Sequence, residues 1–377
     1  MNNELIKNMC LSCNHSKQTQ NNYNLSLRKY CEYFDMSLEE LLMEAEEDEK
    51  NNVRWKNCRL RAKLIEFRHH LLQNYAASTV KKHIWSIKFF YKFYDIEIQS
   101  LPRVTQQSLR KPQPIYYKDL PDKEVIREAF KISSPLMKAI ILFSCSSGCA
   151  RAEALSLTIQ DYIDAVSEYI PRRRMDIFEV IDFLNEKDDV VPTFNLRRKK
   201  TNKYYITYCS PEAVNAINAY ILTRTDSVKN DSPLFDVSPT HLGRSFQKIN
   251  DTLNLGNVGK YARFRSHMLR KFHASALYND GMSIDKVNDL QGKAKNVTDS
   301  VYFMTNPEEL KYEYIRHLPA VTINMDVEKL SIKSPEFMQL ENDKKKLETE
   351  LEVLKREVAD IRSMKKDFEL LKAQIGK

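Results

Sequence analysis

Glycine is scarce in this chain, with 7 among 377 residues. Because phosphate-cradling loops and tight turns depend on glycine, this scarcity argues against nucleotide-binding loops and against an architecture of sheets and turns. Neither G-x-x-x-x-G-K-[S/T] nor G-x-G-x-x-G occurs in the sequence. We therefore expect a fold built mainly from helices, and we expect no cofactor.

Long apolar runs are also missing, and residues 139–145 are too few to cross a membrane and predict a buried helix. No secretory signal opens the sequence, so we expect a cytoplasmic protein without a membrane partner. The seven cysteines are scattered and odd in number, which fits a reducing compartment. Cys10 and Cys13 have zinc-like spacing, but His15 and Cys31 are poorly spaced partners, so we expect no metal site.

What the chain does have is length, apolar content and positive charge. Its 377 residues suffice for two domains, and 42% hydrophobic residues suffice for a sizeable core. The formal net charge is +8, which suits a polyanionic partner.

Apolar periodicity and proline content divide the chain into five segments. Residues 1–18 are polar and predict a flexible N-terminus, whereas residues 19–100 carry apolar positions at helical spacing. These positions include Tyr23, Leu27, Tyr30 and Phe34, then Leu60, Leu64, Phe67 and Leu71. Residues 101–121 contain four prolines and predict a basic linker, and residues 122–325 predict a second, mostly helical domain.

The last segment, residues 326–377, predicts a coiled-coil helix. Apolar side chains recur there every seven residues. They are Leu340, Leu347, Leu354, Ile361, Phe368 and Ile375. A coiled-coil partner is therefore expected, and the alternative is a single amphipathic helix that folds back on the body of the protein.

Basic residues gather at three places where they could contact DNA phosphates. One is a helix predicted to open at Ser78 or Thr79, and another is the linker. The third is a hairpin predicted from residues 193–198 and 204–208, whose tip is basic. The DNA-binding candidates are Lys81, Lys82, Lys88, Arg103, Arg110, Lys111, Arg198, Lys199 and Lys203.

The most informative pattern is His267-x-x-Arg270, followed by Gly292-Lys293 and then Tyr302. Residues three apart are neighbours on one face of a helix, so His267 and Arg270 can hold one phosphate together. A downstream tyrosine could attack that phosphate. Taken alone, the His and Arg could equally be surface residues of an amphipathic helix.

Together with the segment 147–157, these residues resemble the tyrosine recombinase (phage integrase) family, and the archaeal integrase-like branch most closely. The resemblance runs from about residue 19 to residue 322. Box II of the family reads H-x-x-R, then G-H, then Tyr nine residues after that second His; here Lys293 stands in place of that His. Box I usually reads G-x-R-x-x-E. Here Arg151 lies one residue later than the pattern, and an ungapped alignment places Ala150 at the arginine position.

The resemblance implies a fold and a set of roles. The fold is a helical core-binding domain followed by an α-rich catalytic domain with a small β-hairpin.

The resemblance also implies the catalytic roles. Tyr302 is implied as the nucleophile, with Tyr312 and Tyr314 as alternatives. Arg151 and Arg270 clamp the phosphate, with Glu153 orienting Arg151. His267 shares a proton with the tyrosine or bonds a phosphate oxygen, and Lys293 donates to the phosphate. Lys200 is the general acid, with Lys199 and Lys203 as competitors.

The implied activity is site-specific cutting and rejoining of DNA through a 3′-phosphotyrosine, without metal or ATP, by a homotetramer whose partner is double-stranded DNA. The alternatives are a catalytically impaired relative that only binds DNA, a type IB topoisomerase-like enzyme and a structural scaffold. The resemblance also implies a prokaryotic, archaeal setting in association with the nucleoid.

Overall fold

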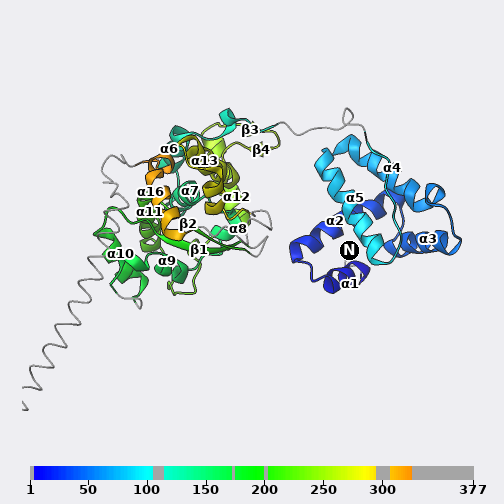
Figure 1. Cartoon of the computed structure of the whole chain (residues 1–377), viewed down its shortest axis with the longest axis horizontal. Helices are drawn as coiled ribbons and strands as arrows, with labels where there is room; N and C mark the ends of the chain where they lie inside the picture. Colours follow the sequence, from blue (N-terminus) through cyan, green and yellow to red (C-terminus); the bar gives the residue numbers. More distant parts are fainter. Residues whose placement is uncertain (1–3, 105–113, 172–174, 199–202, 294–305, 325–377) are drawn as a thin grey trace, which may run out of the picture. The chain divides into compact units, whose positions relative to one another are not determined.

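The computed structural model of the chain describes residues 4–104, 114–171, 175–198, 203–293 and 306–324. The contacts between residues divide the chain into two compact units, Met1–Pro114 and Ile115–Lys377. We call them the first and the second unit. The division falls inside the predicted linker 101–121, and both units are mainly helical, as predicted (Figure 1).

The first unit is a helical bundle around one core of apolar and aromatic side chains. Its elements are α1 (Glu4–Ser12), α2 (Lys17–Phe34), α3 (Leu38–Lys50), the 3-10 helix η1 (Trp55–Asn57), α4 (Arg59–Asn74) and α5 (Ala77–Phe93). The stripes predicted on α2 and α4 are confirmed, except that Phe34 is only half-buried. Helix α3 begins with a capping box, in which Ser37 Oγ accepts from the Glu40 amide and Glu40 Oε2 accepts from the Ser37 amide.

The flexible N-terminus that we predicted is wrong for residues 4–12, which form α1. Three apolar side chains of this helix, Ile6, Met9 and Cys10, are buried in the core of the first unit. Their spacing of three and four places them on one helical face. Tyr94 Oη also donates to the Leu5 carbonyl at 2.8 Å. The helix was overlooked because its apolar face is short and lies among polar residues.

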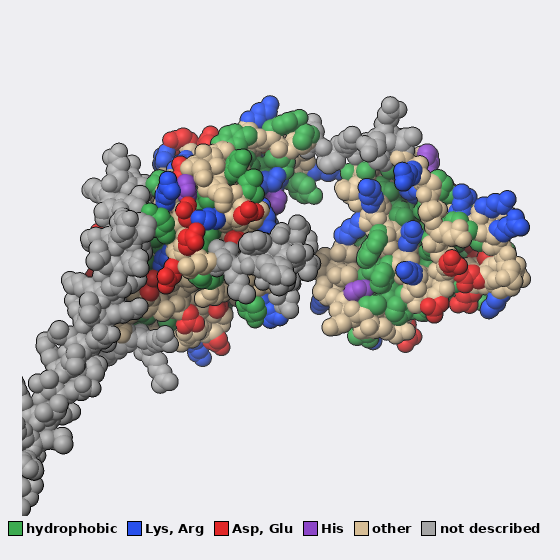
Figure 2. Space-filling model, viewed as in Figure 1, with side chains coloured by type: hydrophobic (Ala, Val, Ile, Leu, Met, Phe, Trp, Pro, Cys, Tyr) green, Lys and Arg blue, Asp and Glu red, His purple; other side chains and the backbone are tan. Residues whose placement is uncertain are grey.

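Helix α5 carries the basic face that the sequence predicted. It begins at Ala77, so neither Ser78 nor Thr79 is its N-cap. Lys81 and Lys82 are exposed and Lys88 is half-buried, while the opposite face packs into the core. Figure 2 shows Lys and Arg side chains spread over the visible face of the first unit, with acidic side chains gathered near α3.

The second unit surrounds the buried helix α7. Its helices before the hairpin are η3 (Tyr117–Asp119), α6 (Lys123–Lys131), α7 (Pro135–Ser147), α8 (Arg151–Ala154), α9 (Ile159–Ala165), η4 (Ser167–Tyr169) and α10 (Ile177–Asn185). Those after it are α11 (Pro211–Leu222), α12 (Pro239–Thr252), α13 (Ser266–Asn279), α14 (Ile284–Leu290), α16 (Pro307–Arg316) and α17 (Leu318–Val321). Helix α7 packs against α11 and α13.

Helix α7 is defined at both ends by its sequence. Ser134 caps its N-terminus and Pro135 occupies the first turn, where a missing N–H costs nothing. Gly148 ends the helix in the left-handed conformation, with φ +62°. The buried helix predicted from residues 139–145 is confirmed. It places Gly148 and the start of α8 beside α13.

The predicted hairpin is confirmed. Strand β1 (Thr193–Arg198) pairs antiparallel with β2 (Lys203–Tyr208), with Arg198 opposite Lys203. Helix α9 packs on β1 and α14 packs on β2. A second pair, β3 (Asn257–Val258) and β4 (Tyr261–Ala262), was not predicted, because strands of two residues carry no alternating pattern.

Across the described ranges, no helix is both long enough and apolar enough to cross a membrane.

Candidate active site

Helix α13 carries both box II residues. Its apolar face, which includes Met268, Leu269 and Phe272, is buried against the rest of the second unit. His267 is exposed, whereas the Arg270 side chain is only 11% exposed. The two residues lie three apart on the helix, so their side chains leave it from neighbouring positions.

Arg270 connects the ends of two other helices. Its Nη1 donates to the Gly148 carbonyl at 2.5 Å and its Nη2 donates to the Gln291 carbonyl at 2.6 Å. Gly148 ends α7 and Gln291 follows α14. The planar guanidinium suits this role because its donors have fixed directions. The same arginine therefore holds box I and the Gly292-Lys293 segment in place.

The carboxylate of Glu153 lies beside Arg270 and is almost fully buried. Its Oε2 is 4.0 Å from Arg270 Nη1 and accepts from Tyr205 Oη at 2.7 Å and from the Ala150 amide at 3.0 Å. Burial and the neighbouring Cys149 and Glu153 raise the pKa of Tyr205 far above its usual 10. Tyr205 therefore stays protonated and serves as a donor to Glu153.

A second arginine, Arg198, reaches the same carboxylate from the end of β1. Its Nε is 3.9 Å from Glu153 Oε1, and its Nη1 donates to the Gly292 carbonyl at 2.5 Å. Lys293 follows directly and is exposed. Desolvation lowers the pKa of Lys293, and the positive charges of Arg270 and Arg198 lower it further. The ammonium group is therefore close enough to both guanidinium groups to be repelled by them.

We call Arg198, Arg270 and Lys293, together with Glu153, the cation cluster. Three positive charges and one negative charge give it a formal charge of +2. Such a cluster attracts an anion with two negative charges more than one with a single charge. The sequence predicted Arg270 and Lys293 as phosphate contacts and Arg198 only as a DNA contact. Its place in the cluster was missed, because it depends on how β1 packs against α8 and on the turn after α14.

Arg151 lies at the first position of α8 and is exposed. Within the described parts of the chain, its side chain forms no hydrogen bond or ion pair. Glu153, which we expected to orient Arg151, instead faces Arg198 and Arg270. The structure therefore does not bring Arg151 into the cation cluster.

His273 is buried on α13 next to Gln291, whose carbonyl accepts a hydrogen bond from Arg270. Burial, and then the charges of Arg270 and Lys293, lowers its pKa to about 3, so the ring stays neutral at physiological pH. Its Nδ1 lies 3.2 Å from Gln291 Nε2, which also donates to the Arg270 carbonyl at 2.9 Å. This amide ties α13 to the residue that precedes Gly292.

Several predicted residues lie outside the described residues: Tyr302, Lys199, Lys200, Arg110, Lys111 and the coiled-coil segment 326–377. Arg103 is exposed and Lys203 is half-buried at the start of β2. Of the alternative nucleophiles, Tyr312 is half-buried on α16. Tyr314 is fully buried and its Oη donates to the Ser146 carbonyl at 2.9 Å, so it belongs to the core.

The chain is fixed to the second unit on both sides of residues 294–305. Before them, the Lys293 amide donates to the Asn288 carbonyl at 2.9 Å. After them, Asn306 caps α16, and Tyr208 Oη donates to the Pro307 carbonyl at 2.6 Å. Tyr302 is four residues from Asn306, a span of at most about 14 Å of extended chain.

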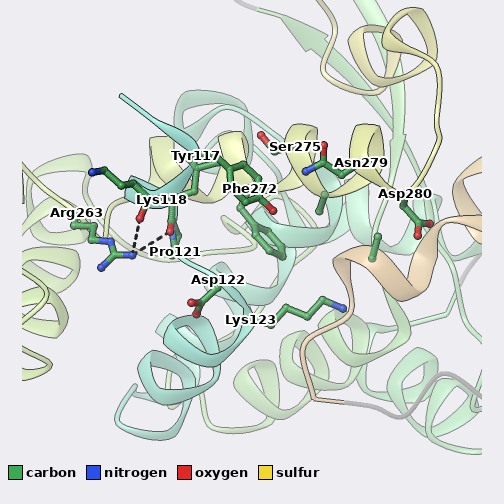
Figure 3. A pocket seen from close by; sticks show the side chains of 13 residues that line it. Tyr117, Lys118, Pro121, Asp122, Lys123, Arg263, Phe272, Ser275, Asn279 and Asp280 are labelled. Carbon is green, nitrogen blue, oxygen red and sulfur yellow. Dashed lines mark hydrogen bonds between the residues drawn. The ribbon is translucent and has the colours of Figure 1, made fainter. Parts of the chain in front are cut away.

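A pocket of about 430 Å³ also opens in the second unit, but it is separate from the cation cluster. Figure 3 shows it between η3, the start of α6 and the face of α13 that carries Phe272, Ser275 and Asn279. At 100° per residue, this face is opposite Arg270. No group of three or more His, Cys, Asp or Glu side chains in the described ranges could hold a metal ion.

Residues 123–309 match the family model described as the phage integrase family. This segment of the chain is therefore a phage integrase family domain. The resemblance stated from the sequence is thereby confirmed at the level of the family, and the match contains both boxes, the hairpin and Tyr302. No curated protein matches this chain.

Solved structures of recombinases and integrases resemble this chain. The XerH site-specific recombinase, in a post-cleavage complex with a palindromic difH substrate, is 17% identical; the match covers 79% of each chain with a TM-score of 0.50. XerA recombinase is 18% identical over 83% of this chain and 96% of its own, with a TM-score of 0.35. The Tn1549 transposon integrase with transposon right end DNA is 15% identical over 68% and 84%, with a TM-score of 0.39. At such identity, the likeness to XerH concerns the fold alone.

Gly292 allows the close contact between the cluster and β2, and its replacement by alanine should be costly. Its φ is +58°, and an added Cβ would lie 2.5 Å from the Tyr205 ring. We expect Gly292→Ala to lower the free energy of unfolding of the protein by about 2–4 kcal/mol, because alanine is strained in the left-handed conformation and its Cβ would overlap the Tyr205 ring. Chemical denaturation measures this loss.

Gly243→Ala is the matched control for Gly292→Ala. Gly243 lies on the exposed face of α12, and an added Cβ there meets no atom within 4 Å. Because alanine favours helices over glycine, this variant should be as stable as the natural protein or more stable by up to about 1 kcal/mol. Equal stability of the two variants would contradict the packing described around Gly292.

Proposed function

We propose that this protein is a site-specific DNA recombinase that cuts and rejoins DNA through a covalent 3′-phosphotyrosine at Tyr302. One observation carries the proposal: the cation cluster beside His267, built from the box II arginine and the Gly292-Lys293 segment. A phosphodiester resists attack because its transition state gathers more negative charge on the phosphoryl oxygens. Fixed cations stabilise that charge, and neither metal nor ATP is required.

The roles follow from the chemistry of each side chain. His267 takes the proton of the Tyr302 phenol, and the phenolate oxygen forms a bond to phosphorus. The bond from phosphorus to the 5′-oxygen breaks, and Lys200 gives that oxygen a proton. Arg270 and Lys293 bind the non-bridging oxygens. A 5′-hydroxyl of another strand then attacks the phosphotyrosine, and the phenol regains its proton as the strands are joined.

The first test is a nicked DNA duplex in which the cleaved strand end diffuses away, so that the covalent adduct accumulates. We expect an adduct that survives denaturing gel electrophoresis and forms in the presence of a metal chelator. A protein that binds DNA but forms no adduct would be the impaired relative. Ala150 at the box I arginine position and Lys293 at the histidine position are the observations that favour this second candidate.

A second assay separates recombination from strand relaxation. A supercoiled plasmid with two target sites would give exchanged products with a recombinase, whereas a type IB topoisomerase-like enzyme would only relax it. Because strand exchange requires cleavage of two duplexes, we propose a homotetramer on two double-stranded DNA segments. Residues 326–377 are proposed to bind a coiled-coil partner, and deleting them should leave cleavage intact.

The setting that we propose follows from this activity. A DNA recombinase acts where the DNA is, so we place it in a prokaryotic cytoplasm in association with the nucleoid. An archaeal origin remains our expectation from the sequence.

The pH dependence of cleavage tests the role of His267. Desolvation, and then Lys271, Arg265 and Arg270, lowers the pKa of His267 below its usual 6.5. A base with a lowered pKa stays unprotonated to lower pH, so the acidic limb of kcat/KM should have its midpoint below pH 6.5.

Removing the imidazole completes this prediction. His267→Gln should lower kcat/KM by about 10²-fold and remove the acidic limb. The profile of single-turnover cleavage from pH 4.5 to 8 measures both effects. An acidic limb that persists unchanged in His267→Gln would assign the proton transfer to another group.

A further inference from the structure

Ala150 stands at the position where the box I pattern has an arginine. It is the N-cap of α8, and its amide donates to Glu153 Oε2 at 3.0 Å. Its methyl group carries no charge and donates no hydrogen bond. The site therefore lacks an arginine from this position, although two negative phosphoryl oxygens require stabilisation in the proposed reaction.

The neighbouring Arg151 does not fill the gap in this structure. Ala150 is the N-cap residue with an extended backbone, whereas Arg151 is the first residue of α8, so the side chains at the two positions leave the chain in different directions. Arg151 is exposed, and among the described residues Glu153 forms no ion pair with it. Glu153 faces the guanidinium groups of Arg198 and Arg270 instead.

Arg198 and Arg270 are placed alike around Glu153. Arg198 donates to the Gly292 carbonyl and Arg270 to the Gln291 carbonyl, which are consecutive in the chain. One guanidinium lies 3.9 Å from Oε1 and the other 4.0 Å from Oε2 of the same carboxylate. The side chains are 20% and 11% exposed, so both reach the surface of the site.

The positive charges of the cation cluster are not used up by Glu153. Both arginines stand beyond hydrogen-bonding distance of Glu153, and Oε2 already accepts from Tyr205 and Ala150. With Lys293 included, three cations share one carboxylate. One carboxylate leaves two of the three positive charges uncompensated, and this excess charge favours the binding of a further anion. Each guanidinium has five N–H donors, and the hydrogen bonds found among the described residues use one in Arg198 and two in Arg270.

We infer that Arg198 is a catalytic residue that grips the scissile phosphate as the partner of Arg270, in place of the arginine missing at position 150. This inference rests on the proposed function and deepens it. One guanidinium binds each non-bridging oxygen, and Lys293 adds a third donor. Glu153 keeps the two arginines apart and oriented, and Tyr205 fixes Glu153 in turn. The strand end of the hairpin thus supplies what box I does not.

The experiment compares Arg198→Ala with Arg151→Ala on two DNA substrates. The cleavage site is first mapped from adducts of the natural protein on a randomised duplex library. Nicked duplexes are then made with an ordinary scissile phosphate or with a neutral methylphosphonate in its place. A methylphosphonate has one negative charge less, so it needs one cation less for cleavage.

We expect Arg198→Ala to lower adduct formation on the phosphate substrate by about 100-fold or more relative to the natural protein. On the methylphosphonate it should form adduct within about tenfold of the natural protein, since the lost cation is no longer required. Arg151→Ala should remain within about threefold on both substrates. If Arg198→Ala does not fold, as judged by circular dichroism, Arg198→Lys and Arg198→Gln are compared by the same criteria.

Two results would overturn the inference while leaving the proposed function intact. One is Arg198→Ala within threefold of the natural protein while Arg151→Ala loses 100-fold, which returns the role to Arg151. The other is a loss in Arg198→Ala that the methylphosphonate does not restore, which indicates a purely structural role. Failure of the natural protein to form any adduct would instead contradict the proposed function itself.

Discussion

Replacement of Arg270 by alanine is expected to lower the rate of DNA cleavage by about 10³-fold. The reason is that Arg270 offers a two-pronged grip on phosphate while it fixes the surrounding chain. Its Nη1 and Nη2 donate to Gly148 and Gln291, so the variant loses both a charge and the alignment of two helix ends. Single-turnover adduct formation measures the rate.

Binding and stability should respond much less than cleavage. Arg270 is one of many phosphate contacts expected for a DNA-clamping protein, so the dissociation constant should rise by less than about tenfold. Lys131→Ala is a suitable control, because Lys131 is an exposed lysine that, among the described residues, pairs with Glu128 on its own helix. If Arg270→Ala cleaved DNA as fast as Lys131→Ala, the cation cluster would not be the phosphate site.

Arg270→Lys separates charge from geometry. An ammonium keeps the positive charge but cannot reach two carbonyls and a phosphate in one plane. We expect this variant to remain at least about 10²-fold slower than the natural protein. Full activity of Arg270→Lys would show that only the charge matters at this position.

Tyr302→Phe is expected to reduce the covalent adduct to below detection, because phenylalanine has no oxygen to attack phosphorus. DNA binding should be unchanged. The assay is the nicked duplex described above, resolved under denaturing conditions. Since the hydroxyl is the only group removed, no other substitution should affect the chemistry so completely.

Two further tyrosines serve as matched controls for Tyr302→Phe. Tyr312→Phe changes a half-buried residue of α16 and should form adduct at the natural rate. Tyr314→Phe removes the hydrogen bond to the Ser146 carbonyl and should cost about 1 kcal/mol of stability while the adduct still forms. Loss of the adduct in Tyr312→Phe, with Tyr302→Phe active, would move the nucleophile to α16.

The sequence was sufficient where the signal is local. Apolar spacing predicted α2 and α4, a short apolar run predicted the buried helix α7, and aromatic and β-branched residues on both sides of a basic tip predicted the β1–β2 hairpin. Four prolines predicted the linker within which the two units divide. Helix α1 was missed because three apolar residues among polar ones are too few to distinguish a packed helix from a loose terminus.

The candidate site was only partly predictable. His267 and Arg270 are recognisable because their spacing is a property of one helix. Arg198 is different, since its contact with Gly292 spans 94 residues and depends on tertiary packing. The same holds for Tyr205, whose hydrogen bond to Glu153 crosses from β2 to α8. The one-residue shift in box I could therefore be read from the sequence, but which arginine lies near Glu153 instead could be seen only from the packing of the neighbouring elements.

Identification of the residue joined to DNA is the most direct test of the account. The adduct formed by the natural protein on a nicked duplex would be digested with protease and nuclease, and the peptide that carries the nucleotide would be sequenced by mass spectrometry. The account predicts a 3′-phosphonucleotide on the oxygen of Tyr302. Attachment to any other side chain, or the absence of a linked peptide from a protein that joins DNA strands, would contradict it.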